Sequence, residues 1–155
     1  MTDASPCEVW FYHLERMTLE QVLPELLEKT LGRGWRAQVR SADSSRLEAM
    51  DTWLWTYRDD SFLPHGLERN TFADRQPILL TKAGDNTNPN GAQALFVLDG
   101  DPGDIAGFSR CVVVFDGRDE DALQSARGLW SRYRKAGHGV TYWRQGESRG
   151  WEKQG

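Results

Sequence analysis

The sequence predicts an α/β fold, with one mostly parallel sheet and helices on both of its faces. Apolar runs of strand length alternate with amphipathic segments of helical spacing along the first third of the chain, which is the pattern of parallel strands joined by helices. Two later runs, 94–98 and 111–115, are apolar almost throughout and suit strands that are covered on both faces. The length of 155 residues is typical of one domain, so we expect residues 1–155 to form a single unit.

The first predicted strand and helix have clear local signals. Residues Glu8–Leu14 form an apolar and aromatic run of the right length for a buried strand. Thr18 and Gln21 have the spacing of a capping box, so a leucine-rich helix is expected to begin there and to end at one of the two glycines that follow it. Pro24 lies inside this helix, where it either kinks the helix or marks regular hydrogen bonding that starts only just before it.

A second strand and helix follow in the same order. Residues Trp35–Arg40 read as a strand with less apolar content than the first, which favours a position nearer the edge of the sheet. Asp43 or Ser44 then caps a second helix. Its apolar residues recur at spacings of three and four: Leu47, Met50 and Leu54.

The second half of the chain continues with strands and one long helix. The helix carries acidic residues at its start and basic residues at its end, in agreement with the helix dipole. The polar residues at the C-terminus are expected to form a loose tail. The expected ranges are strands at 77–81, 94–98, 111–115 and 140–143, the helix at 119–135, and the tail at 144–155.

The segment 54–67, here called the central segment, is unusually apolar for a connection between the two halves. Loops are commonly polar, yet this one places bulky apolar side chains around an acidic pair. Either it folds back into the core, which is the commoner fate of such residues, or it is presented to a partner. The bulky residues are Trp55, Tyr57, Phe62 and Leu63.

Composition limits the classes of function. The net charge of −4 and the pI of about 5.4 argue against a broad phosphate-binding face. Cys7 and Cys111 are too few for a disulfide framework and are expected to be buried, reduced thiols. No signal peptide or apolar run of membrane-spanning length is present, so a cytoplasmic protein without membrane attachment is expected. Seven tryptophans favour protein partners, with direct binding of single-stranded nucleic acid as a weaker alternative.

Motifs for catalysis are few. The chain has neither the glycine pattern of dinucleotide-binding folds nor a P-loop, and His13 has no Cys or second His at metal-ligand spacing, so we expect no cofactor and no metal. The best enzymatic candidate is the loop 99–104 after a predicted parallel strand. Its carboxylates, on Asp99, Asp101 and Asp104, suit a metal-dependent phosphotransferase or hydrolase, although Asp, Gly and Pro are also ordinary turn residues.

The last predicted helix carries two stripes at helical spacing. One consists of small and apolar residues and is the expected core face: Ala122, Ala126, Leu129 and Tyr133. The other lies roughly 100° away and places an indole between two guanidiniums: Leu123, Arg127, Trp130 and Arg134. This second stripe is either a solvated shoulder of the helix or a receptor for a short peptide that has carboxylates and an apolar end.

Two stretches resemble a known family. The central segment, with Ser61-Phe62-Leu63-Pro64-His65, and the helical stretch Ala126–Gly137 are similar to the chi subunit of bacterial DNA polymerase III. The order and spacing of the predicted elements from Val9 to Gly139 fit the Rossmann-like, three-layer fold of that family. The resemblance therefore covers most of the chain.

The resemblance implies a non-catalytic accessory protein of the clamp-loader complex in DNA replication. It implies binding of the acidic, Phe-ended C-terminal tail of single-stranded DNA-binding protein, so that DNA is reached only indirectly. The tail site of the family matches Arg127, Trp130 and Ser131, where Ser131 stands in place of an expected cation. Arg134 or Lys135 can supply that cation from the next turn.

The resemblance also implies attachment to the clamp loader through the psi subunit or another clamp-loader subunit. The aromatics of that surface match Trp55 and Phe62 in the central segment. The implied surface also takes in the residues that follow Phe62 directly, namely Leu63, Pro64 and His65.

Overall fold

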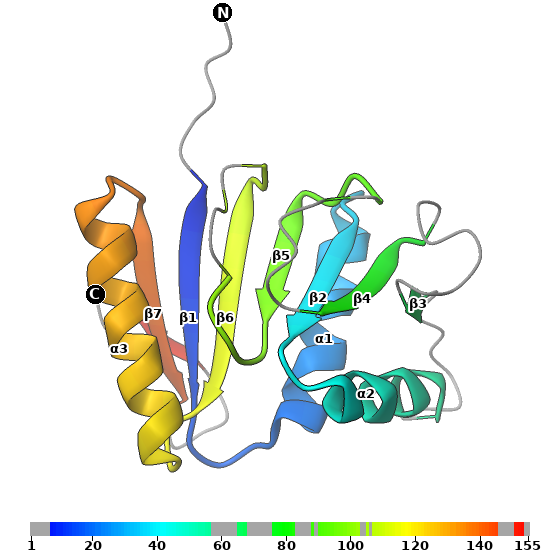
Figure 1. Ribbon diagram of the computed structural model, residues 1–155, viewed down its shortest axis with the longest axis horizontal. Helices are drawn as coiled ribbons and strands as arrows, with labels where there is room; N and C mark the ends of the chain where they lie inside the picture. The colour runs from blue at the N-terminus through cyan, green and yellow to red at the C-terminus, as the bar shows by residue number, and fades with distance from the viewer. Residues whose placement is uncertain are drawn as a thin grey trace, which may run out of the picture.

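The computed structural model describes residues 7–56, 65–67, 76–82, 88, 90–102, 105, 107–145 and 151–153. Within them the chain forms one sheet of eight strands and three helices (Figure 1). The strand order is β3-β4-β2-β5-β6-β1-β7-β8, and all neighbours are parallel except β7 and β8. The predicted α/β class with a mostly parallel sheet is confirmed. The elements are β1 (Glu8–Leu14), α1 (Leu19–Gly32), β2 (Ala37–Ser41), α2 (Ser44–Thr56), β3 (His65–Leu67), β4 (Ile78–Lys82), β5 (Ala94–Val97), β6 (Arg110–Asp116), α3 (Glu120–Lys135), β7 (Val140–Gln145) and β8 (Trp151–Lys153).

Two apolar clusters lie on the two faces of the sheet, because neighbouring side chains of a strand point to opposite sides. On one face α1 and α2 pack against the sheet, and on the other face α3 covers β1 and β6 (Figure 1). In β1, for example, Tyr12 and Leu14 belong to the first cluster, whereas Val9 and Phe11 belong to the second. Helices on both faces explain why the central strands are apolar almost throughout.

Helix α1 begins with the expected capping box. The Gln21 amide donates to the Thr18 hydroxyl, and the Thr18 amide donates to the Gln21 side chain. The helix begins at Leu19 and continues through Pro24 to Gly32, so its regular structure does not start only just before the proline. Pro24 has no N–H to donate to the carbonyl of Glu20, four residues earlier. That carbonyl instead accepts a hydrogen bond from the Trp53 indole of α2 at 2.7 Å.

Strand β2 does not lie near an edge, and this expectation was wrong. It is the third strand of the sheet, between β4 and β5, and all its residues are buried. Its polar side chains are satisfied internally: the Arg40 guanidinium donates to the Gln38 amide oxygen and to the Pro102 carbonyl, and Thr81 also donates to Gln38. A buried hydrogen-bonded network allows a polar sequence to occupy a central strand.

Short strands at both edges correct two further expectations. In the central segment, the first three residues continue α2 and residues 65–67 form β3, which pairs in parallel with β4. The tail expected to be loose returns to the sheet where it is described, because Trp151–Lys153 pair antiparallel with β7 as β8. Neither strand has the length or alternation that identifies a strand in sequence.

Of the helices in the described part of the chain, none is long and apolar enough to cross a membrane.

Candidate functional site

Helix α3 presents the core face that its spacing predicts. Asp119 is the N-cap, and its carboxylate accepts from the amides of the first helical turn. Ala126, Leu129 and Tyr133 are buried against the sheet. Burial raises the pKa of the Tyr133 hydroxyl to about 12. The stripe of Arg127, Trp130 and Arg134 therefore lies at the outer edge of the helix.

Trp130 is half-buried and forms one wall of an aromatic seam between α3 and β7. Its ring meets Tyr142 at 5.6 Å and Phe11 at 5.6 Å, both in edge-to-face orientation. Tyr142 in turn stacks on Phe11 at 6.2 Å. Trp130 thus caps the core while part of its surface stays accessible, and the interpretation of the stripe as a peptide receptor stays a prediction.

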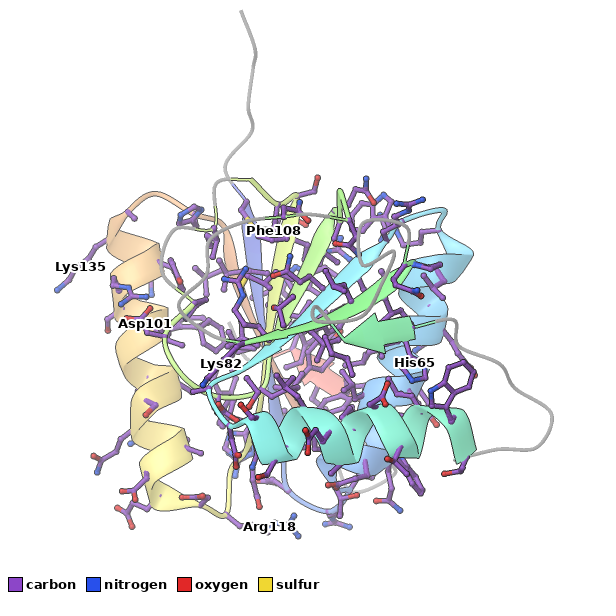
Figure 2. All side chains as sticks on the ribbon, turned by 45° about the vertical axis from the view of Figure 1, so that its right-hand side comes forward. His65, Lys82, Asp101, Phe108, Arg118 and Lys135 are labelled. Atoms are coloured by element: carbon purple, nitrogen blue, oxygen red, sulfur yellow. The ribbon has the colours of Figure 1, made fainter. Side chains whose placement is uncertain are left out.

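The cations of α3 are all exposed, and one of them is held in an ion pair. Arg132 forms a two-pronged ion pair with Asp101, with N···O distances of 2.7 and 2.6 Å. Arg127, Arg134 and Lys135 are exposed, and none of the ion pairs found between described residues includes them. In Figure 2 Asp101 lies beside α3, and Arg118 and Lys135 lie at the two ends of that helix. Ser131, also exposed, adds no charge.

A polar group at the end of β1 lies beneath the aromatic seam. The Tyr142 hydroxyl and His13 Nδ1 are 2.5 Å apart, and Arg144 donates to Glu15 at 2.6 and 2.8 Å. Burial, followed by the nearby Arg144 charge, lowers the pKa of His13, and Arg127 contributes in the same direction. Burial raises the pKa of Tyr142, and Arg127 partly opposes this. Arg127 is therefore close enough to the seam for its charge to act there.

Tyr142 is a site residue that the sequence interpretation did not single out. The alternation of side chains along 140–144 was available as a signal, since it places Val140, Tyr142 and Arg144 on one face of the strand. Which helix that face meets depends on the pairing of β7 with β1, which no local pattern records. His13 packs between Phe115, Tyr142 and the backbone of Gly117.

The second predicted site begins at the end of α2. Trp55 is 51% exposed, and its ring lies 4.5 Å from that of His65. His65 is buried beside the last turns of α2 (Figure 2), where its Nε2 lies 3.0 Å from the Asp51 carbonyl and 3.2 Å from the Asp51 carboxylate. The Trp55 ring is therefore packed against a His65 ring that is itself buried and held by Asp51. Phe62, Leu63 and Pro64, the rest of this predicted site, lie outside the described residues.

The acidic loop after β5 does not bring its described carboxylates together. Asp99 accepts from the Ser41 hydroxyl and the Ala42 amide, both at 2.6 Å, and lies 3.1 Å from Arg46. Asp101 is held instead by Arg132 of α3. Asp104 lies outside the described residues. Among the described residues no cluster of three His, Cys, Asp or Glu side chains could hold a metal ion.

By fold and surface, this is an α/β protein with a cationic and aromatic helix face, a chemistry suited to acidic partners. A family model described as DNA polymerase III chi subunit, HolC, matches residues 7–141. The chain belongs to the DNA polymerase III chi subunit family, as its resemblance implied.

Two curated relatives carry the same name. The probable DNA polymerase III subunit chi of Rickettsia prowazekii (strain Madrid E) is 30% identical over 95 residues, which are 61% of this chain and 55% of that protein. The DNA polymerase III subunit chi of Pseudomonas aeruginosa PAO1 is 28% identical over 119 residues, or 76% and 80% of the two chains. The matched part thus spans about half the length of the Rickettsia protein.

Proposed function

We propose that this protein is a non-catalytic accessory subunit of the replicative DNA polymerase III, a Rossmann-like domain that links single-stranded DNA-binding protein to the clamp loader. Membership of the chi family supports this role. The observation that carries the proposal is the outer edge of α3, where a half-buried indole lies between exposed guanidiniums. An acidic peptide that ends in an aromatic residue has the matching chemistry.

On this proposal, Arg127 and Arg134 bind carboxylates of the tail, and the tail's Phe packs against Trp130 and Tyr142. Arg–carboxylate hydrogen bonds are charge-assisted and can be bidentate, which gives orientation as well as affinity. The ring edges of the seam offer an apolar wall that is already held by Phe11. Ser131 contributes no cation, so Arg134 or Lys135 takes that role from the following turn.

The tail site is tested with a labelled peptide that carries the acidic, Phe-ended sequence, by fluorescence anisotropy. Arg127→Ala and Trp130→Ala are each expected to weaken binding at least about tenfold, since each removes a contact of hot-spot type. Arg118→Ala is the matched control, because it removes an exposed cation near the other end of α3. Salt should weaken wild-type binding. Equal affinities of wild type, Arg127→Ala and Trp130→Ala would refute the site.

The clamp-loader contact is proposed at Trp55, with Phe62, Leu63 and Pro64 added by the family resemblance. A large, exposed aromatic ring is uncommon without a use, and tryptophan is enriched at the centres of interfaces. His65 lies against the Trp55 ring and is proposed to hold it in place. The partner is the psi subunit or another clamp-loader subunit.

Binding of that partner by isothermal titration calorimetry tests this second contact. Trp55→Ala is expected to abolish measurable binding while leaving the affinity for the tail peptide unchanged, because the two sites lie on different elements. Retention of full partner affinity in Trp55→Ala would remove Trp55 from the interface.

A further inference from the structure

A row of alternating guanidiniums and indoles lies on the face of the sheet that α1 covers, away from α3. The Arg33 guanidinium is 4.3 Å from the centre of the Trp35 ring. Arg110 lies 5.2 Å from the same ring and 3.8 Å from that of Trp10. Trp10 then meets Trp143 at 5.9 Å. We call these five residues the indole–guanidinium row.

The row is partly open to solvent. Trp10, Trp35 and Trp143 are each half-buried, and Arg33 is exposed. A pocket of about 140 Å³ is lined by Trp10, Trp35, Arg33 and Arg110. Aromatic contacts continue beneath the row, where the buried Tyr12 ring stacks on Trp143 and meets the half-buried Trp151 ring of β8 at 4.8 Å.

The charge along the row is predominantly positive. Lys29 lines the same pocket and is exposed, and neither Lys29 nor Arg33 takes part in an ion pair found among the described residues. Arg110 pairs with Glu8 at 3.3 Å. Three cations thus lie beside one paired carboxylate, in a protein whose net charge is −4.

Two buried donors in the row have no hydrogen-bond partner among the described residues. They are Arg110 Nε and Trp143 Nε1, on residues that both contact the Trp10 ring. Buried donors are nearly always satisfied in folded proteins, so two on one surface call for an explanation. Both atoms are covered by protein, so the proposal below rests on the accessible rings and cations of the row and not on these two donors.

We propose that the indole–guanidinium row binds single-stranded nucleic acid directly. Bases stack on indole rings and on guanidinium planes without regard to sequence, because every base has a flat face. Phosphates are attracted by Lys29, Arg33 and Arg110. An acidic peptide with a single aromatic end would use one ring, whereas this surface offers three indoles in one continuous row.

This inference goes beyond the proposed function and does not rest on it. It differs from the expectation that the protein reaches DNA only through its partners. The row lies on the opposite face of the sheet from the α3 seam, as Trp10 and Trp35 pack against one apolar cluster and Trp130 packs against the other. Both ligands can therefore be bound at once.

The test uses the full chain and a fluorescent oligothymidylate of about 15 nucleotides, a length within the range that one small domain covers. Anisotropy is measured from low to moderate salt. Wild type is expected to bind at low salt, with a Kd that rises steeply with salt. The double variant Lys29→Ala/Arg33→Ala changes only exposed side chains and is expected to bind about tenfold more weakly, with a log–log salt slope lower by about two.

Two further variants separate the row from general charge effects. Arg16→Ala/Arg118→Ala removes two exposed cations next to the carboxyl ends of β1 and β6 and should leave oligonucleotide affinity unchanged. Trp35→Ala should weaken binding without changing the salt slope, since it removes a stacking surface and no charge.

The proposal is overturned if wild type binds no oligonucleotide at low salt, or if Lys29→Ala/Arg33→Ala binds as wild type does. It is also overturned if the oligonucleotide is lost in Arg127→Ala/Arg134→Ala instead, which would place binding on α3. If the acidic tail peptide binds to the row and the oligonucleotide does not, the row is a peptide site, and the proposal is likewise overturned.

Discussion

The hydrogen bond between Trp53 and the carbonyl of Glu20 allows a quantitative test of how α1 tolerates a proline. Pro24 cannot donate to that carbonyl, and the Trp53 indole donates to it at 2.7 Å, a normal length for a hydrogen bond of this kind. Trp53→Phe keeps an aromatic ring and removes the donor. A typical hydrogen bond contributes about 0.5–1.5 kcal/mol to the free energy of unfolding. We expect Trp53→Phe to lose about that much, in addition to the effect of its smaller ring.

A double-mutant cycle separates the two effects. In a Pro24→Ala background the amide of residue 24 can donate to Glu20, so the indole bond is no longer needed and Trp53→Phe should lose only its packing contribution. The expected coupling energy is about 1 kcal/mol. In urea unfolding followed by circular dichroism this corresponds to a midpoint difference of about 0.5 M, for a slope of about 2 kcal/mol/M. An equal loss in both backgrounds would refute the role assigned to Trp53.

Three further outcomes are expected. Gly117→Ala should lower the unfolding free energy by about 1–3 kcal/mol, because a Cβ there would lie 1.8 Å from His13 Nε2; unchanged thermal unfolding would show that His13 moves freely. Burial lowers the pKa of His13 from its ordinary 6.5, so the native state favours the neutral ring, and the stability present above that pH should be lost as the pH falls below it. His13→Gln should reduce the change of the urea-unfolding midpoint with pH below that value. Burial raises the pKa of Cys7 to about 12 and raises that of Cys111, so Ellman's reagent should titrate both thiols only after unfolding. Rapid reaction of the native protein would contradict their burial.

Most of the regular structure follows from local patterns. The capping box of α1, the core stripe of α3 and the apolar run of β1 were predicted because their signals lie within a few residues of one another. The same periodicity placed Arg127, Trp130 and Arg134 on one edge of α3. These parts of the candidate site required no knowledge of which elements pack together.

The failures share a physical cause. Strand β2 looked like an edge strand because Gln38 and Arg40 are polar, and only tertiary contacts with Thr81 and Pro102 satisfy them in the interior. The short edge strands β3 and β8 are held by the neighbours with which they pair rather than by their own sequences.

The amino-acid sequence by itself therefore determined the α/β class, the helix faces and the resemblance to the chi family, because periodicity, capping and motif spacing are local properties. The tertiary structure alone decided the strand order and which side chains from distant parts of the chain contact one another. It placed Tyr142 of β7 against Trp130 of α3 and paired Arg132 with Asp101 in an ion pair. It also aligned Trp10, Trp35 and Arg110 in one row. Such contacts join residues far apart in the chain, and they are set by the packing of whole elements.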